Sequence, residues 1–279
     1  MYLRPGTLDE ALLALAQTHA TILSGGTDLF PAFTGGQLKG PVLDISAVTE
    51  LKGIHTSEEF FHIGARTTWS EFLAAALPRG FDGLRAAARE IGSIQIQNSA
   101  TLAGNICNAS PAADGVAALL ALDAQVVLVS RKGTRRIPLG DFIQGNRKTV
   151  RQPDEILTSI CIPRRWDNAT SSFLKLGARR YLVISIVMVA ANLLVDSDCR
   201  IREAAICVGS CSAKAVRLVA LEKTLAGAVA SPEIQQLLTT GHLSDLSPID
   251  DIRATAAYRS EAAETLVRRA LAECVTKVL

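Results

Sequence analysis

The sequence predicts an α+β fold, because segments with strand character and segments with helical periodicity occur in separate runs. In the last third of the chain the strands come first and the helices follow, which is the order typical of an α+β domain. The strands are expected at residues 173–178, 183–194 and 201–208, and the helices at residues 214–225, 232–238 and 250–277.

The first 165 residues mix short strands with helices that begin at recognisable caps. Thr7 and Glu10 form a capping box in front of an apolar stripe, which predicts the first helix. Lys132 and Gly133 form the turn of a hairpin, and Gly35-Gly36 is expected in a connection. Strands are expected at residues 21–23, 42–45, 59–65, 125–130, 135–137 and 155–162, and further helices at residues 69–76, 83–91 and from residue 114 onward.

A polar stretch at residues 166–170 is a candidate linker between two domains. The first domain is expected at residues 1–165, with subdomains of about 1–54 and 55–165, and the second at residues 171–279. A chain of 279 residues is long enough for two domains and a sizeable core.

Composition and charge exclude several classes of protein. The net charge is +2, so nothing favours nucleic acid or an anionic membrane as a partner. The N-terminus lacks the pattern of a signal peptide, and the longest apolar run is broken by Ser185 and Asn192, so no membrane span and a cytoplasmic location are expected. The six cysteines contain no C-x-x-C pair and the four histidines no ligand spacing, so no metal site is expected in this chain.

A long run of uncharged polar residues between Ile91 and Ser110 is the most unusual feature of the chain. It contains amides, hydroxyls and glycines but no lysine or arginine, so we expect a loop that folds over a ligand rather than a solvated surface. The backbone N–H groups of such a loop can hold an anion, and Gly104 lets a ligand approach closely. Asp114, just after Pro111, is expected to open an apolar helix. The alternative is an ordinary loop-to-helix connection.

A second glycine-containing loop, Ser24-Gly25-Gly26-Thr27-Asp28, follows the short strand at residues 21–23 directly. A strand followed by a glycine-rich turn is a common shape for holding phosphate. The loop is neither a Rossmann fingerprint nor a Walker loop, since the G-x-G-x-x-G and Gly-Lys-Ser/Thr patterns are absent. A lone Gly-Gly pair could be a plain turn, but two such loops favour a diphosphate clamped between them.

Seven segments, spread in order over nearly the whole chain, resemble the FAD-binding medium subunit of molybdenum hydroxylases, the xanthine dehydrogenase and carbon monoxide dehydrogenase family. The segments are SGGTDL, QIQNSATLAGNICNASPAAD, LLALDA, DEIL, FLKLGARR, VGSCSAKAVRL and DIRATAAYR. The resemblance implies a two-subdomain FAD-binding domain of the PCMH type, which is similar to vanillyl-alcohol oxidase. A C-terminal α+β domain of the CO dehydrogenase flavoprotein type would follow it.

The resemblance also implies which residues hold FAD. The two loops that would contact its diphosphate are Leu23, Ser24, Gly25, Gly26, Thr27, Asp28 and Leu29, and Thr101, Leu102, Ala103, Gly104 and Asn105. The family's ligand aspartate falls at Asp114, a leucine near the cofactor at Leu157, and the flavin-site lysine at Lys175. A cation at Lys175 would stabilise the anionic reduced flavin and raise its potential. The alternatives are a surface lysine at position 175 and a helix cap at Asp114, and Asp114 could fill both roles.

Three positions depart from the family pattern. Ala103 stands where many relatives have glycine, which is tolerated only if its φ is negative or close to it. Gln97-Asn98-Ser99-Ala100 stands where many have Arg-Asn-x-Gly, so one cation is lost. Ile91 stands where animal xanthine dehydrogenases place an aromatic ring by the flavin, so aliphatic contact would replace stacking there and change the flavin potential and the access of nicotinamide.

The function implied by the resemblance is electron transfer within a heterotrimer. A molybdopterin-binding large subunit would hydroxylate the organic substrate, and a [2Fe–2S] small subunit would pass electrons to this FAD. The flavin would then reduce NAD⁺ or another acceptor, and no catalytic acid, base or nucleophile is expected in this chain. Two alternatives are a self-sufficient flavin oxidoreductase on the same fold, resembling the enolpyruvyl reductase of cell-wall synthesis, and a scaffold that has lost its flavin.

Overall fold

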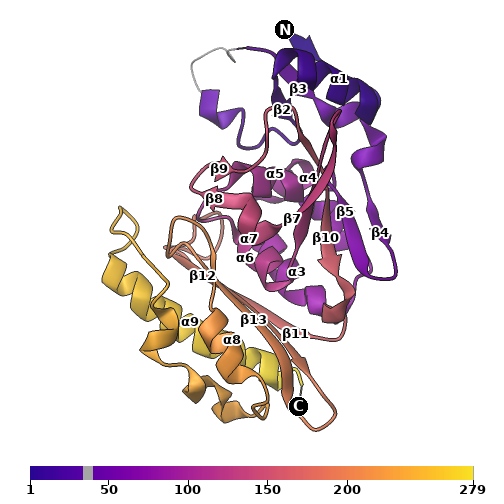
Figure 1. The fold of residues 1–279 in the computed structure, drawn as a ribbon. Helices are drawn as coiled ribbons and strands as arrows, with labels where there is room; N and C mark the ends of the chain where they lie inside the picture. The colour runs from indigo at the N-terminus through magenta and orange to yellow at the C-terminus, as the bar shows by residue number, and fades with distance from the viewer. Residues whose placement is uncertain (34–39, 279) are drawn as a thin grey trace.

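The computed structural model describes residues 1–33 and 40–278, and it confirms the α+β fold (Figure 1). Within these residues the strands form four β-sheets. The connection expected at Gly35-Gly36 lies outside the described residues.

A small parallel sheet with strand order β1-β3-β2 forms the N-terminal end of the molecule. Helix α1 begins after Thr7, whose side chain accepts a hydrogen bond from the backbone N–H of Glu10. The second half of the expected capping box does not form, because Glu10 accepts instead from the N–H of Gly6. The elements are β1 (Tyr2–Leu3), α1 (Leu8–Thr18), β2 (Thr21–Leu23) and β3 (Val42–Asp44).

A five-stranded antiparallel sheet, in the order β4-β5-β10-β6-β7, forms the centre of the first half of the chain. Alternate residues such as Ile63, Val126 and Ile160 point to one buried face, where they share the largest hydrophobic core with α2, α3 and α6. The hairpin expected at Lys132 and Gly133 is confirmed. The strands are β4 (Ile54–Thr56), β5 (Phe60–Gly64), β6 (Gln125–Ser130), β7 (Gly133–Pro138) and β10 (Ile156–Pro163).

Helices and a short hairpin surround this sheet. The helices are α2 (Trp69–Ala74), α3 (Asp82–Glu90), α4 (Ile94–Ser99), α5 (Leu102–Asn108), α6 (Asp114–Ala121) and α7 (Leu139–Phe142). The hairpin consists of β8 (Ile143–Gly145) and β9 (Lys148–Thr149).

The expectation of an irregular loop between residues 91 and 110 is wrong, because α4 and α5 occupy most of it. Ser93 accepts a hydrogen bond from the N–H of Ile96, and Thr101 accepts one from the N–H of Gly104. These hydroxyls are N-caps of two short helices. The polar composition that suggested a loop therefore belongs in part to helix capping.

The C-terminal part is a four-stranded antiparallel sheet whose own helices cover one face, while helices of the first half of the chain cover the other. In Figure 1 α8 and α9 cover its outer side, while α3 and α6 lie against its inner side. Met188 and Cys207 therefore join the core of the first half of the chain, whereas Val187 and Val189 pack in a second core with α9. The elements are β11 (Thr170–Leu176), β12 (Val187–Val195), β13 (Ile201–Gly209), β14 (Val216–Arg217), α8 (Val219–Leu225) and α9 (Ala256–Thr276).

Two helices begin later in the chain than expected. The helix expected from residue 250 begins at Ala256, because the Asp250 carboxylate accepts the N–H of Ala256 in a preceding turn. The helix expected from residue 214 begins at Val219, because Val216 and Arg217 pair with β13 as an edge strand. Short 3₁₀ helices occur at Pro31–Phe33, Ile45–Ala47, Thr49–Leu51, Arg79–Phe81, Arg164–Trp166, Pro232–Leu237 and Thr240–Leu243.

The stretch at residues 166–170 is not an exposed linker. Trp166, Ala169 and Thr170 are buried, and the indole N–H of Trp166 donates to Asp123 at 3.0 Å. The two halves of the chain are thus in contact where the domain boundary is expected, and the boundaries themselves stay predictions. Of the helices in the described residues, none combines the length and the apolar character needed to cross a bilayer.

Candidate functional site: a cavity between two glycine loops

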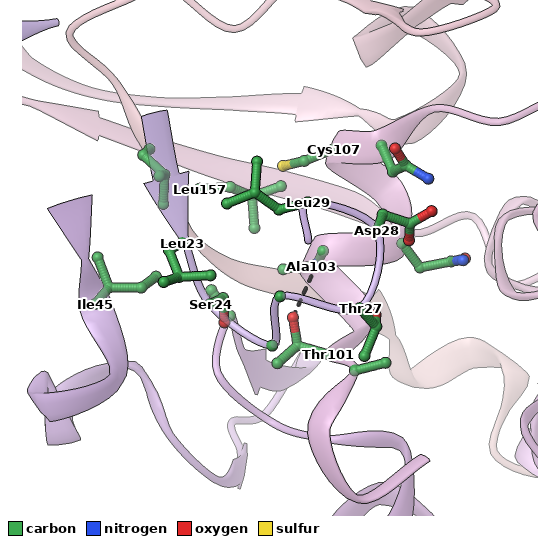
Figure 2. A pocket seen from close by; sticks show the side chains of 18 of the residues that line it. Leu23, Ser24, Thr27, Asp28, Leu29, Ile45, Thr101, Ala103, Cys107 and Leu157 are labelled. Atoms are coloured by element: carbon green, nitrogen blue, oxygen red, sulfur yellow. Dashed lines mark hydrogen bonds between the residues drawn. The ribbon is translucent and has the colours of Figure 1, made fainter. Parts of the chain in front are cut away.

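A cavity of about 830 Å³ lies between the parallel sheet and helices α4 and α5. Leu23 to Leu29 form one wall, and residues around the start of α5 form the opposite wall. Figure 2 shows Leu23, Ile45 and Leu157 gathered at one end, with Thr27 and Asp28 towards the other. The cavity thus has an apolar end and a polar end.

The two glycines of the first loop are required for different reasons. A Cβ at Gly25 would lie 2.1 Å from the backbone oxygen of Ser99, so only glycine lets this loop reach the end of α4. Gly26 has φ +71°, a conformation that favours glycine. The Gly-Gly pair therefore both shapes the first loop and brings it against the second.

A row of backbone donors borders the cavity in the first loop. Among the described residues, no acceptor is found for the N–H groups of residues 25–29. The turn is closed by the next N–H group, which Phe30 donates to the oxygen of Gly26 at 3.0 Å. Free N–H groups in successive turn residues form a concave site for an anion.

Two buried side chains in the cavity wall also lack partners. Trp69 Nε1, a donor, and Asn105 Oδ1, an acceptor, have no hydrogen-bond partner within residues 1–33 and 40–278. Buried polar atoms are nearly always paired in folded proteins. Both atoms are fully buried, and Asn105 Oδ1 lies beside Gly115 of α6, so they face the protein interior rather than the cavity. The features that fit FAD are instead the free N–H groups of residues 25–29 and the apolar and polar ends of the cavity.

The cavity also contains arginines that the sequence analysis missed. Arg147 and Arg151 line it from the segment around the β8–β9 hairpin. The guanidinium of Arg147 donates to Asn108 Oδ1 and lies 4.0 Å from Asp28 Oδ1. No local sequence signal links residue 147 to the glycine loops, because the link depends on how the hairpin packs against α5.

The structure shows how the chain accommodates Ile91 and Ala103, two of the residues that depart from the family pattern. Ile91 lines the cavity, and its carbonyl accepts a hydrogen bond from Gln97 Nε2 at 3.1 Å. The side chain of Gln97 therefore holds α4 against the end of α3. Ala103 lies in α5, where φ is negative, so its Cβ is tolerated.

Three of the expected site residues do not line this cavity: Leu102, Asp114 and Lys175. Leu102 is fully buried in the core beneath α5. The other expected residues do line it: Leu23, Ser24, Gly25, Gly26, Thr27, Asp28, Leu29, Ile91, Thr101, Ala103, Gly104, Asn105 and Leu157.

Asp114 and Lys175 form a buried ion pair just beyond the cavity. Lys175 Nζ lies 2.6 Å from Asp114 Oδ2, and both side chains are only 7% exposed. The same ammonium donates to the carbonyl of Glu90 at 3.4 Å, next to Ile91 in the cavity wall. The surface-lysine alternative for Lys175 is therefore wrong.

The helix-cap alternative for Asp114 is also wrong. Asp114 is the first residue of α6 and makes no capping bond, because its carboxylate bonds to Lys175 and to Ser185 Oγ. Burial raises the pKa of Asp114, and the charge and hydrogen bond of Lys175 oppose that rise. Within the described parts of the chain no cluster of three or more histidine, cysteine or acidic residues could hold a metal ion.

Two family models together cover almost the whole chain. Residues 1–165 match the FAD binding domain in molybdopterin dehydrogenase, and residues 172–274 match the CO dehydrogenase flavoprotein C-terminal domain. The chain belongs to the family of FAD-binding medium subunits of molybdenum hydroxylases. It therefore carries an FAD-binding domain and is a subunit of an oxidoreductase.

Relatives and solved structures agree with this family. The nicotinate dehydrogenase FAD-subunit of Eubacterium barkeri is 37% identical over 203 residues, 70% of this chain and 69% of that protein. A putative xanthine dehydrogenase FAD-binding subunit of Escherichia coli K12 is 29% identical over 98% of this chain and 95% of its own length. In carbon monoxide dehydrogenase from Hydrogenophaga pseudoflava, a chain of 25% identity superposes with a TM-score of 0.91, covering 99% of this chain and 97% of its own.

Proposed function

We propose that this chain is the electron-transfer subunit of a heterotrimeric molybdenum hydroxylase. It would take electrons from a [2Fe–2S] subunit and pass them from FAD to NAD⁺ or another acceptor, while a molybdopterin-binding subunit hydroxylates the substrate. The observation that carries the proposal is the cavity between the first glycine loop and helices α4 and α5, with its row of unpaired N–H groups. The cytoplasmic location and the domain boundaries expected from the sequence are part of the same proposal.

The two ends of the cavity would take different parts of the cofactor. The N–H groups of residues 25–29 would donate to the diphosphate, and Arg147 would add a positive charge near it. Bound FAD supplies the electron chemistry, and the protein supplies position and electrostatics.

Lys175 and Asp114 are proposed to act beside the flavin through their charges. The pair lies behind Ile91, close to the cavity but outside its wall. A buried ammonium near the flavin would favour the anionic reduced form. Asp114 would compensate this charge in part, so the ionisation of Asp114 would help to set the flavin potential.

A self-sufficient flavin oxidoreductase would need a substrate pocket with its own proton donor. Among the described residues of the cavity wall, no cysteine or serine is hydrogen-bonded to a histidine. The only histidine in the wall that the structure describes is His19. A subunit that exchanges electrons with partners needs no such pair.

A thiol-protection experiment tests where FAD binds. Cys107 lines the cavity and is exposed to it, and Cys199, also exposed, lies in the turn between β12 and β13 and serves as an internal control. Desolvation raises the pKa of the Cys107 thiol to about 11, so labelling is carried out at alkaline pH. Apo protein is labelled with a maleimide with and without excess FAD, and each cysteine-containing peptide is quantified by mass spectrometry. We expect FAD to slow labelling of Cys107 and to leave Cys199 unchanged.

Equal labelling of Cys107 with and without FAD would place the cofactor elsewhere. The purified chain should also be yellow and release one noncovalent FAD on acid denaturation. It should contain no iron or molybdenum and should hydroxylate no heterocycle or aldehyde until the two partner subunits are added. Hydroxylation by the chain alone would favour a self-sufficient flavin enzyme, and a colourless chain after reconstitution with FAD would favour a scaffold.

A further inference from the structure

A buried serine completes the ion pair beside the proposed flavin site. Ser185 Oγ donates to Asp114 Oδ1 at 2.5 Å, while Lys175 Nζ donates to Asp114 Oδ2 at 2.6 Å. Ser185 is 2% exposed and lies in the segment between β11 and β12. Each oxygen of the aspartate therefore has its own donor, and the two donors are ten positions apart in the sequence.

This second donor matters because the carboxylate is taken out of water. An ionised carboxylate in a buried site is costly unless its oxygens accept hydrogen bonds. Lys175 occupies one oxygen only, and the hydroxyl of Ser185 is the other side-chain donor that the structure gives to Asp114. Without that hydroxyl, Oδ1 would be buried and unpaired.

We propose that Ser185 is a positioning residue that keeps Asp114 ionised and directed at Lys175, and so controls how much positive charge Lys175 presents to the flavin. The proposal rests on the proposed function, since it assumes that FAD lies in the cavity next to the ion pair. Ser185 does not touch the cavity wall, so it acts through Asp114 rather than on the cofactor itself.

Two charged groups face Asp114 and affect its ionisation. Lys175 reaches it from β11, and Glu90 approaches from the end of α3. Burial raises the pKa of Asp114; the charge and hydrogen bond of Lys175 and the hydrogen bond of Ser185 lower it, and the charge of Glu90 raises it. Ser185 is thus an uncharged hydrogen-bond donor that favours the ionised form of Asp114.

The consequence is a pH-dependent flavin potential. When Asp114 is ionised it compensates Lys175, and when Asp114 is protonated the ammonium acts on the flavin uncompensated. The midpoint potential should therefore fall through a breakpoint as the pH rises and Asp114 loses its proton. Removing the Ser185 hydroxyl disfavours the ionised form, so the breakpoint should move to higher pH.

The test measures the midpoint potential of bound FAD against pH by spectroelectrochemistry in three variants. In Ser185→Ala we expect the breakpoint at higher pH than in the wild type, with a higher potential in the interval between the two breakpoints. Ser185→Thr keeps a hydroxyl and should restore the wild-type profile. The matched control is Ser172→Ala, because Ser172 is also 2% exposed and donates to a carboxylate, Glu273 Oε2, at 2.6 Å.

Each result bears on a different claim. A breakpoint that is unmoved in Ser185→Ala, or that moves equally in Ser172→Ala, would overturn the role of Ser185 while leaving the FAD site intact. A wild-type chain that binds no FAD would overturn the proposed function and this inference with it. A shift confined to Ser185→Ala and reversed by threonine would establish the positioning role.

Discussion

Substitution of Gly25 tests whether close packing of the two loops is needed for FAD binding. In Gly25→Ala the new Cβ would lie 2.1 Å from the oxygen of Ser99 and 3.0 Å from Cα of Ala100, whereas ordinary van der Waals separation begins at 3.4 Å. Both neighbours are backbone atoms at the end of α4, so the first glycine loop and α4 must separate by more than about 1 Å. Overpacking of this kind costs about 1–3 kcal/mol of folding stability.

The effect on FAD binding should be of the same order as the effect on folding. A hydrogen bond to a charged group contributes about 1.5–3 kcal/mol, so breaking one hydrogen bond between residues 25–29 and the diphosphate should weaken binding about tenfold or more. Gly140→Ala is the matched control, because its new Cβ would come no closer than 3.7 Å to any neighbour and its φ is not positive.

The assay is fluorescence titration of apo protein with FAD, with thermal unfolding measured in parallel. We expect Gly25→Ala to lower the unfolding temperature by a few degrees and to raise the FAD dissociation constant at least tenfold. Gly140→Ala should change neither. Wild-type FAD affinity in Gly25→Ala would refute the argument that close packing of the loops organises the diphosphate site.

Two further predictions concern charge. Gly104→Asp should abolish FAD binding, whereas Gly104→Asn should weaken it less, because only the carboxylate repels the diphosphate across the cavity. If FAD titrations show an equal loss of affinity in both variants, the size of the new side chain rather than its charge is the cause. Asp251→Asn should destabilise the C-terminal domain at neutral pH, because Arg259, 3% exposed, loses its carboxylate partner at 2.7 Å. The backbone N–H of Arg253 and the hydrogen bond of Arg259 lower the pKa of Asp251 to about 2. Its stabilisation is therefore present above about pH 3.9 and lost as the pH falls towards 2, so urea midpoints of the variant and the wild type should converge there.

Local sequence patterns were sufficient where the local chain itself determines the structure. The strand at residues 21–23 and the hairpin turn at Gly133 were predicted correctly, because alternating side chains and turn residues specify them within a few positions. The polar run after Ile91 was misassigned for the same local reason. Ser93 and Thr101 are favoured both in loops and as helix caps, and composition alone does not distinguish the two.

The sequence by itself determined the family and the glycine pair, and 13 of the 16 residues that it predicted for the FAD site line the cavity, because most of these residues lie in two continuous segments. Only the tertiary structure decided that Arg147 borders the same cavity and that Asp114 meets Lys175 and Ser185, which are 61 and 71 positions away. Those interactions arise because the inner face of the C-terminal sheet buries its apolar side chains against α3 and α6. That burial is non-directional and sums over many side chains, so no short motif records which polar groups it brings together.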